Sequence, residues 1–210
     1  MNNPSPILCT AFAGPRLIAF GCLQEVALKA QESESRDPSA PVLIFDDLTS
    51  NVIEVDLRGT PASLVERLAA IEIYATPPTE PAAAEECARK PGRPKLGVVA
   101  REVTLLPRHW DWLASQPGGA SVALRKLVEE ARKANQGRDR RRRAQEATYR
   151  FISAMAGNEP GFEEATRALF AGNQPRFAEL VEAWPIDLRN HAKKLASAAF
   201  SALDQALLAD

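Results

Sequence analysis

The sequence predicts an α+β protein made of four successive segments. Short apolar runs alternate with helical patterns up to residue 74, which indicates a small α+β module. Residues 75–97 hold five prolines and no sustained period, which is typical of an extended linker. A single strand with two helices follows at 98–135, and from residue 136 to 210 only helical periodicity remains. We therefore expect a module, a basic linker, a central unit and an α-helical tail.

The composition predicts a folded protein with a buried core, reduced cysteines and no membrane segment. The chain has 210 residues, 45% of them hydrophobic, so it can bury a core. It has no apolar run near the roughly 20 residues that span a bilayer, and "MNNPSPILCTAF" lacks the features of a signal peptide. The three cysteines (Cys9, Cys22 and Cys87) are scattered and odd in number, which favours reduced thiols. We expect a cytoplasmic protein that has no membrane segment.

The first module shows a hairpin and a helix. "ILCTAF" and "RLIAF" are apolar runs separated by Gly14 and Pro15, which predicts two strands joined by a tight turn. "CLQEVALKAQES" then has the spacing of a helix. Its predicted buried face consists of Leu23, Val26, Ala27 and Ala30.

The sequence of residues 41–71 predicts two more strands and a second helix. "PVLIFDD" and "NVIEVDLRG" are joined by a polar turn, and in the second Ile53, Val55 and Leu57 alternate with polar residues. "TPASLVERLAAI" predicts a helix, with Thr60 as its cap and Pro61 in its first turn.

The central unit begins with a strand that has no partner nearby in the sequence. Val98–Leu106 is too short to bury its apolar face alone, and an isolated edge leaves its backbone groups unpaired. Pairing with the same strand of a second copy would satisfy both needs, so we expect a homodimer through this strand. Helices are predicted from Pro107 and from Ser121 to about Ala134, and "NQGRDRRRR" is expected to separate the second from the tail. The apolar faces expected to cover the ribbon are Trp110, Leu113 and Ala114, then Leu124, Leu127, Val128 and Ala131.

Charge is unevenly distributed although the net charge is −1. Residues 88–143 hold 15 Lys and Arg against 5 Asp and Glu, whereas residues 1–80 hold 5 against 11. A positive segment between acidic flanks favours a polyanionic partner, since a solubilising surface has no need to separate its charges.

The residues "REVTLLPRHWDWLASQPGGASVALRKLVEEARK" resemble the ribbon-helix-helix family of bacterial DNA-binding proteins. In that family, two strands form an antiparallel ribbon in the major groove of double-stranded DNA, and the second helix holds a phosphate at its N-terminus. The resemblance implies phosphate contacts from Ser121 and Val122, with Arg125 and Lys126 one turn later.

The register of the strand decides which side chains face the bases. If Val103 and Leu105 face the core, then Glu102 and Thr104 face the groove, and Thr104 is a plausible base contact. Glu102 fits only if it accepts from a cytosine amino group. The opposite register would expose Arg101, but also Val103 and Leu105.

Two basic stretches flank this unit. "PGRPK" resembles the core of an AT-hook, with Arg93 inserted in a narrow minor groove and Lys95 on phosphate, although Pro91 stands where hooks usually have arginine. The alternative is a plain basic linker. The run Arg138–Arg143, including Arg141, either grips the phosphate backbone or is a solvated start to the tail.

Other candidate sites have simpler explanations. Trp110 and Trp184 fit a core, whereas Trp112 is offset to the outer face and suggests a dimer or interdomain contact. Asp46 and Asp47 end a strand without a third metal ligand. Neither His109 nor His191 has the partner of an activated nucleophile, so we expect no enzyme, no cofactor and no metal.

Nearly the whole chain is similar to an uncharacterised bacterial family, domain of unknown function 2239. The phrases "TAFAG", "PVLIFDD", "GRPKLGVVAREVTLLPRHWDWLASQPGGASVALRKLVEEAR" and "FISAMAGNEPGFEEATRALFAGN" carry this similarity, which implies no activity. The expected function is DNA binding, as in a transcriptional regulator. The rival is a homodimeric interaction or scaffold protein whose ribbon only dimerises.

Overall fold

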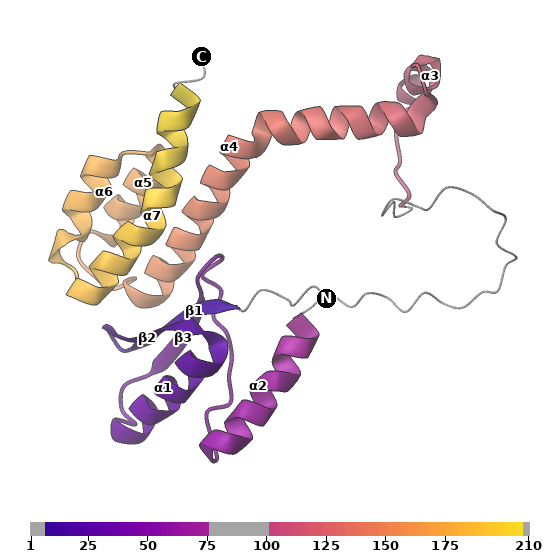
Figure 1. The fold of residues 1–210 in the computed structure, drawn as a ribbon. Helices are drawn as coiled ribbons and strands as arrows, with labels where there is room; N and C mark the ends of the chain where they lie inside the picture. The colour runs from indigo at the N-terminus through magenta and orange to yellow at the C-terminus, as the bar shows by residue number, and fades with distance from the viewer. Residues whose placement is uncertain (1–6, 76–100, 208–210) are drawn as a thin grey trace, which may run out of the picture. The chain divides into compact units, whose positions relative to one another are not determined.

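The computed structural model describes residues 7–75 and 101–207, with side chains over 7–69 and 101–201. The chain divides into two compact units, which we treat separately. The first combines Met1–Pro77 with Gln136–Asp210, and the second is Pro78–Asn135. Within its described residues the protein has the mixed α+β composition that the sequence predicts (Figure 1).

The sheet of the first unit has three antiparallel strands. β1 (Leu8–Ala13) and β2 (Arg16–Cys22) form the predicted hairpin, and β3 (Val42–Asp46) pairs with the other side of β1. The order β2-β1-β3 therefore makes β1 central. Gly14 turns the hairpin with a φ of +52°, a backbone conformation that glycine adopts without steric cost.

One face of the sheet is covered by α1 (Leu23–Arg36) and α2 (Pro61–Ala75). The four residues predicted to face the core from α1 are all buried there. Cys9, Ala11 and Ile44 of the sheet meet them in one apolar cluster. Thr60 caps α2 as predicted, because its hydroxyl accepts a hydrogen bond from the Ser63 N–H at 3.3 Å.

The predicted strand over "NVIEVDLRG" is wrong. Only Val52 forms a bridge, to Phe45, and residues 53–57 have no ladder. The alternation nevertheless has the expected meaning, since Ile53, Val55 and Leu57 are partly buried against the α1 cluster while Glu54 and Asp56 are exposed. The pattern comes from one-sided burial of an extended chain, which does not require a sheet partner.

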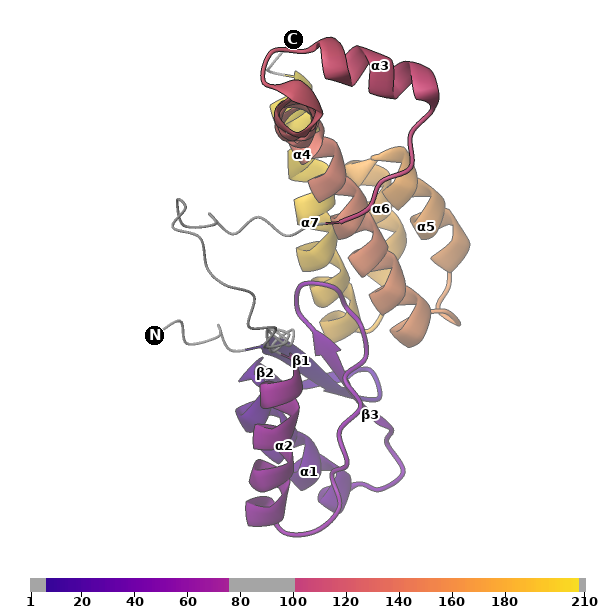
Figure 2. The same cartoon turned by 90° about the vertical axis from the view of Figure 1, so that its right-hand side faces the viewer.

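The opposite face of the sheet packs on the helical tail. Figures 1 and 2 show these helices on the other side of the sheet from α1 and α2. They are the C-terminal part of α4 (Gly119–Met155), α5 (Phe162–Ala171), α6 (Gln174–Leu180), a 3-10 turn (Val181–Ala183) and α7 (Ile186–Leu207). Phe12, Phe45 and Phe151 join sheet and helices, with ring centroids 5.3 Å apart for Phe12–Phe151 and for Phe45–Phe151. The α+β module and the tail thus share one core.

Helix α4 runs without interruption through the stretch predicted to break it. The expected separation at "NQGRDRRRR" is therefore wrong. Arginine is a good helix former, and a lone glycine costs a helix only about 1 kcal/mol relative to alanine, so Gly137 does not end it. The helix also begins at Gly119, two residues before the predicted start at Ser121.

In the second unit, α3 (Pro107–Ser115) has the predicted proline start. Residues 101–106 of the predicted strand form neither a helix nor a strand ladder in the single chain, and Leu106 has an extended backbone. Val98–Ala100 lie outside the described residues, as does the linker with Arg93 and Lys95. The pairing of this strand with a second copy stays a prediction.

Candidate nucleic-acid interface

The segment 101–106 carries the residues predicted to face DNA. Arg101, Glu102 and Thr104 are all exposed. Val103 and Leu106 are exposed too, at 54% and 50%, whereas Leu105 is half-buried. In one chain both faces of the segment are therefore open, so burial does not choose between the two registers.

The turn between α3 and α4 depends on two consecutive glycines. Gly118 and Gly119 have φ values of +86° and +75°, which other residues rarely adopt. A Cβ on Gly118 would also lie 3.1 Å from the Val122 Cβ. The turn thus brings the start of α4 close behind the end of α3.

The first turn of α4 holds the predicted phosphate-binding residues Ser121 and Val122. Because Gly119 has a left-handed φ of +75°, helical backbone geometry begins at Ala120, and Val122 is the third helical residue. The N–H groups of the first helical residues have no carbonyl partner within their own helix, so those of Ala120, Ser121 and Val122 are the donors that this helix start offers to an anion. The Gly119 N–H is engaged, donating to the Gln116 carbonyl at 2.9 Å. The phosphate contact itself stays a prediction.

Two basic side chains follow on the next turn. Arg125 is exposed and folds back along the helix, with its Nε donating to the Ser121 carbonyl at 3.0 Å. Lys126 is exposed beside it. Both can reach solvent near the free N–H groups, which is the arrangement that a phosphate requires.

The apolar faces of α3 and α4 are mostly uncovered. Leu113 is buried, but Trp110 is 41% exposed, and Ala114, Leu127 and Val128 are exposed as well. Leu124 is half-buried and Ala131 is exposed. The prediction of a core role for Trp110 is therefore wrong for the single chain, because the second unit is too small to cover it. Trp112 is exposed, as expected for an outer-face residue.

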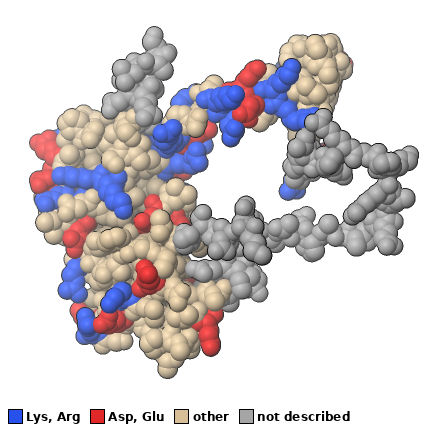
Figure 3. All heavy atoms as spheres, viewed as in Figure 1, with Lys and Arg blue, Asp and Glu red and all other residues tan. Residues whose placement is uncertain are grey.

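The arginine run lies on α4 within the first unit. Figure 3 shows Lys and Arg gathered along this helix. Arg140, Arg142 and Arg143 are exposed, and Arg142 contacts Asp139 at 3.4 Å. Arg141 is half-buried, and its buried Nε has no hydrogen-bond partner in the described part of the chain. Arg141 is therefore less accessible to a phosphate than its neighbours.

The two aspartates and the tryptophan for which the sequence predicts a structural role form hydrogen bonds within the fold. Asp46 accepts hydrogen bonds from the N–H and hydroxyl of Thr49, each at 2.7 Å. Asp47 accepts from the Thr10 hydroxyl at 2.6 Å. Trp184 is buried and donates its Nε1–H to the Pro160 carbonyl at 2.9 Å, which confirms its core role. Over the described ranges, no group of three or more His, Cys, Asp and Glu side chains could hold a metal ion.

One cluster of polar residues was missed at the sequence level. Thr10, Asp187, Asn190, His191 and Lys194 line a common hollow beside the sheet. The helical spacing of positions 187, 190, 191 and 194 places them together on α7, but only the packed sheet brings Thr10 to them. No local pattern in the sequence indicates that approach.

Comparison with known proteins identifies a family. None of the helices in the described residues is long and apolar enough to cross a membrane. Searches of the curated proteins and of the solved structures found no match. One family model, described as "Uncharacterized protein conserved in bacteria (DUF2239)", matches residues 8–196 and so covers both units. The chain belongs to this DUF2239 family of uncharacterised bacterial proteins.

Proposed function

We propose that this protein binds double-stranded DNA as a homodimer. The ribbon is made by residues 101–106 of two copies, and the first turn of each α4 holds a phosphate. The observation that carries the proposal is the row of exposed apolar side chains in the second unit. Val103, Leu106, Trp110, Leu127 and Val128 lie in the same 35 described residues, where a soluble single chain would gain by covering them.

The chemistry around this row favours DNA over a protein partner. The free N–H groups at the start of α4 point at a negative ligand, and Arg125 and Lys126 add full charges one turn later. Within residues 101–135 there are six Lys and Arg against four Asp and Glu, and the linker before them adds further basic residues. Such contacts to phosphate supply most of the affinity of a DNA-binding protein.

The ribbon supplies the contacts to bases. Thr104 presents a hydroxyl that can donate to or accept from a base edge, and its methyl can contact thymine. Glu102 accepts from the amino group of cytosine and is repelled elsewhere in the groove, so it selects for that base. Arg93 and Lys95 of the linker anchor the dimer in the neighbouring minor groove, and the exposed arginines of residues 138–143 add contacts that do not depend on sequence.

The rival function is a dimeric interaction protein that does not read DNA. The exposed carboxylate of Glu102 is the observation that favours it, because phosphates repel a carboxylate in the groove and its usual base partner is the amino group of cytosine alone. Under this alternative the ribbon still forms, and the basic residues meet an acidic protein surface.

Fluorescence anisotropy with labelled duplexes distinguishes the two functions. The full chain is titrated into A·T-rich and G·C-rich duplexes at 50 and 200 mM salt. We expect binding that weakens steeply with salt, and a loss of at least about tenfold in affinity for the double variant Arg125→Ala, Lys126→Ala. Because a dimer carries each residue twice, the slope of log K against log salt should fall by up to about 4.

A matched control removes two charges from the other unit. Arg167 pairs with Glu163 and Glu164 on α5, and Arg176 pairs with Glu179 on α6. The double variant Arg167→Ala, Arg176→Ala should bind DNA as the wild type does. Absence of binding at 50 mM salt by a dimeric chain, or equal losses in the two double variants, would refute the DNA proposal and leave the interaction protein.

A further inference from the structure

A hollow of about 280 Å³ lies between the β1–β2 hairpin and α7, within the first unit. Thr10, Asp187, Asn190, His191 and Lys194 form its polar wall, and Leu17 and Phe20 form its apolar wall. It lies outside the second unit, which holds the proposed DNA contacts.

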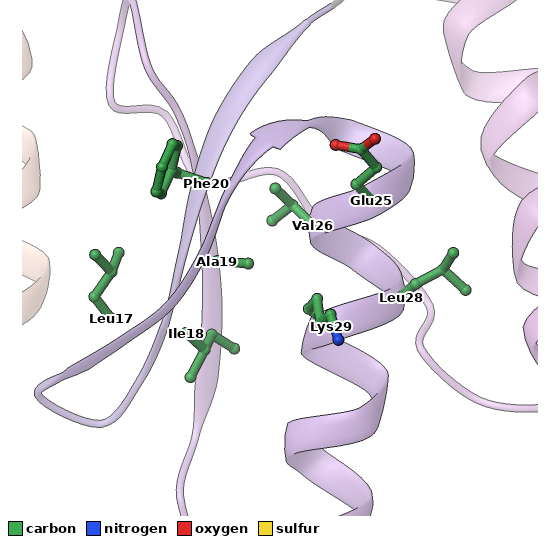
Figure 4. Close-up of a pocket in the computed structure, with 8 residues that line it drawn as sticks. All are labelled: Leu17, Ile18, Ala19, Phe20, Glu25, Val26, Leu28 and Lys29. Carbon is green, nitrogen blue, oxygen red and sulfur yellow. The ribbon is translucent and has the colours of Figure 1, made fainter.

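A β-bulge creates the apolar wall. Ala11 pairs with Ala19 and Phe12 pairs with Leu17, so Ile18 is an extra residue in β2. The extra residue puts Leu17 and Phe20 on the same face, whereas a regular strand would put residues three apart on opposite faces. Figure 4 shows both side chains pointing away from α1, while Val26 points from α1 toward the strand. Phe20 is 75% exposed, so its ring is available for contact.

Two of the polar groups in the hollow are engaged in the fold. One oxygen of Asp187 accepts a hydrogen bond from the Leu17 N–H at 2.9 Å, which ties the edge strand to α7. Asp187 also lies in the first turn of α7, where the helix dipole stabilises a negative charge. The Thr10 hydroxyl donates to Asp47 at 2.6 Å. These hydrogen bonds hold the two carboxylates in place but leave their negative charge beside the hollow, and Lys194 is the positive charge in the wall that offsets it.

The remaining polar side chains have no partner. His191 is only 8% exposed, and its ring packs against Phe12 and Phe151 with centroids 5.3 and 4.5 Å away. In the described part of the chain, neither its imidazole nor the side chains of Asn190 and Lys194 form a hydrogen bond or ion pair. Asn190 and Lys194 are exposed and can be hydrated, so only His191 is a nearly buried polar side chain. Its position at the wall of the hollow, next to two further donors, points to a ligand.

The imidazole is neutral near pH 7. Burial lowers the pKa of His191 to about 4, with a further decrease from the charge of Lys194 and a partial increase from Asp47. A neutral imidazole has one N–H donor, the Asn190 amide has two, and the Lys194 ammonium has three. The unpartnered groups are thus rich in donors and include one positive charge.

We propose that this hollow binds a small carboxylic acid with an aliphatic or aromatic body. Lys194, Asn190 and His191 donate to the carboxylate from adjacent turns of α7, and Leu17 and Phe20 contact the apolar body. An inorganic anion would use the donors but leave the apolar wall exposed, and an amine would meet Lys194 with like charge. The binding requires no DNA.

The two histidines of the chain provide the test. The full-length protein, free of DNA, is titrated with benzoate while the histidine ring signals are followed by NMR. We expect the His191 signals to move and saturate, while those of the exposed His109 in α3 stay in place as an internal reference. Bound benzoate should also raise the pKa of His191, because its negative charge favours the imidazolium against the opposing effect of Lys194. Asp187 and Asp47 favour the imidazolium with or without benzoate, so they do not cause the change.

Related probes and variants identify the recognised chemistry. Benzamide, which lacks the charge, and acetate, which lacks the body, should each bind at least about tenfold more weakly than benzoate. Lys194→Gln should weaken benzoate binding by at least about tenfold, and Lys133→Gln, which removes the same charge from an exposed position of the other unit, should leave it unchanged. Equal movement of His109 and His191, equal binding of benzamide, or equal effects of the two lysine variants would overturn the proposal. Because DNA is absent, these outcomes are independent of the proposed DNA binding.

Discussion

His191 makes the stability of the first unit depend on pH. Its pKa in the folded protein is about 4, mainly because of burial, against about 6.5 for an unfolded histidine. Between these values the unfolded chain binds a proton that the folded chain does not, so stability falls as the pH decreases from about 6.5 to 4. The full effect is about 3 kcal/mol.

Urea denaturation at intervals from pH 7.5 to 4 measures this dependence. His191→Gln removes the titrating group, so its free energy of unfolding should change less over that range than the wild type's. His109→Gln is the matched control, because His109 is exposed and should follow the wild-type curve. Parallel curves for all three proteins would contradict the assignment to His191.

For single residues, the sequence predicts the role of a side chain correctly when its contacts depend on its own helix or strand. The buried face of α1 follows from helical spacing, and the cap at Thr60 follows from the residue types preferred at a helix start; both are confirmed. The hollow around His191 was not predictable in this way, because it needs Thr10 and Phe20 from the sheet beside α7, more than 160 residues apart in the chain. A β-bulge at Ile18 could not be predicted either, because residues 17–20 form a continuous apolar run without alternation that would reveal an extra residue.

At the scale of the element, the continuity of α4 gives a direct prediction. Gly137 lies inside the helix and has no atom within 4 Å of the position that a Cβ would take. Gly137→Ala should therefore raise the free energy of unfolding by about 0.5 to 1 kcal/mol, because alanine has lower conformational entropy when unfolded and favours the helix.

Gly137→Pro is the opposing change. Proline removes a backbone donor and clashes with the preceding turn, so it should destabilise the helix by about 3 kcal/mol or more. Circular dichroism during thermal unfolding measures both variants. If residues 135–143 formed a loop, both substitutions would have small effects, and that result would contradict a continuous helix.

The predicted break illustrates why element boundaries are hard to derive from sequence. "NQGRDRRRR" has glycine, asparagine and dense like charge, each of which is common in loops, but none of them forbids a helix. The arginines are spread around the helix, and Asp139 relieves their repulsion through Arg142. The predicted strand at residues 51–59 failed for the converse reason, since its alternating burial is real but the sheet ends at β3.

At the scale of the whole molecule, the two compact units differ in how far they bury their apolar side chains. The first has a three-layer arrangement, with apolar clusters on both faces of its sheet. The second leaves Val103, Leu106 and Trp110 in contact with solvent. Sequence patterning predicted that the strand at 98–106 requires a partner from elsewhere, but it placed Trp110 in a core. It did not predict that the tail would complete the core of the N-terminal module, since that contact joins the two ends of the chain.

The uncovered second unit leads to a prediction about oligomeric state. If residues 101–106 pair across a two-fold axis, the chain should sediment at twice its 22.8 kDa mass at tens of micromolar. Val103→Glu places two like charges near that axis and adds a carboxylate where apolar contact is needed, so it should shift the mass to that of one chain. Because Val103 is 54% exposed in the single chain, the substitution should leave the helical circular dichroism of the monomer unchanged.

Leu48→Glu is the control for the general effect of a new charge at an exposed apolar position. Leu48 is exposed in the turn after β3, in the first unit. Its backbone N–H donates to the Asp46 carboxylate at 3.0 Å, and the substitution preserves this hydrogen bond because it leaves the backbone unchanged. This variant should remain dimeric. A wild type that sediments as one chain would show that the exposed apolar row has no second copy as its partner. Dissociation of Leu48→Glu to the same extent as Val103→Glu would show that the dimer forms through another surface, and the ribbon would then have no two-stranded form to place in a major groove.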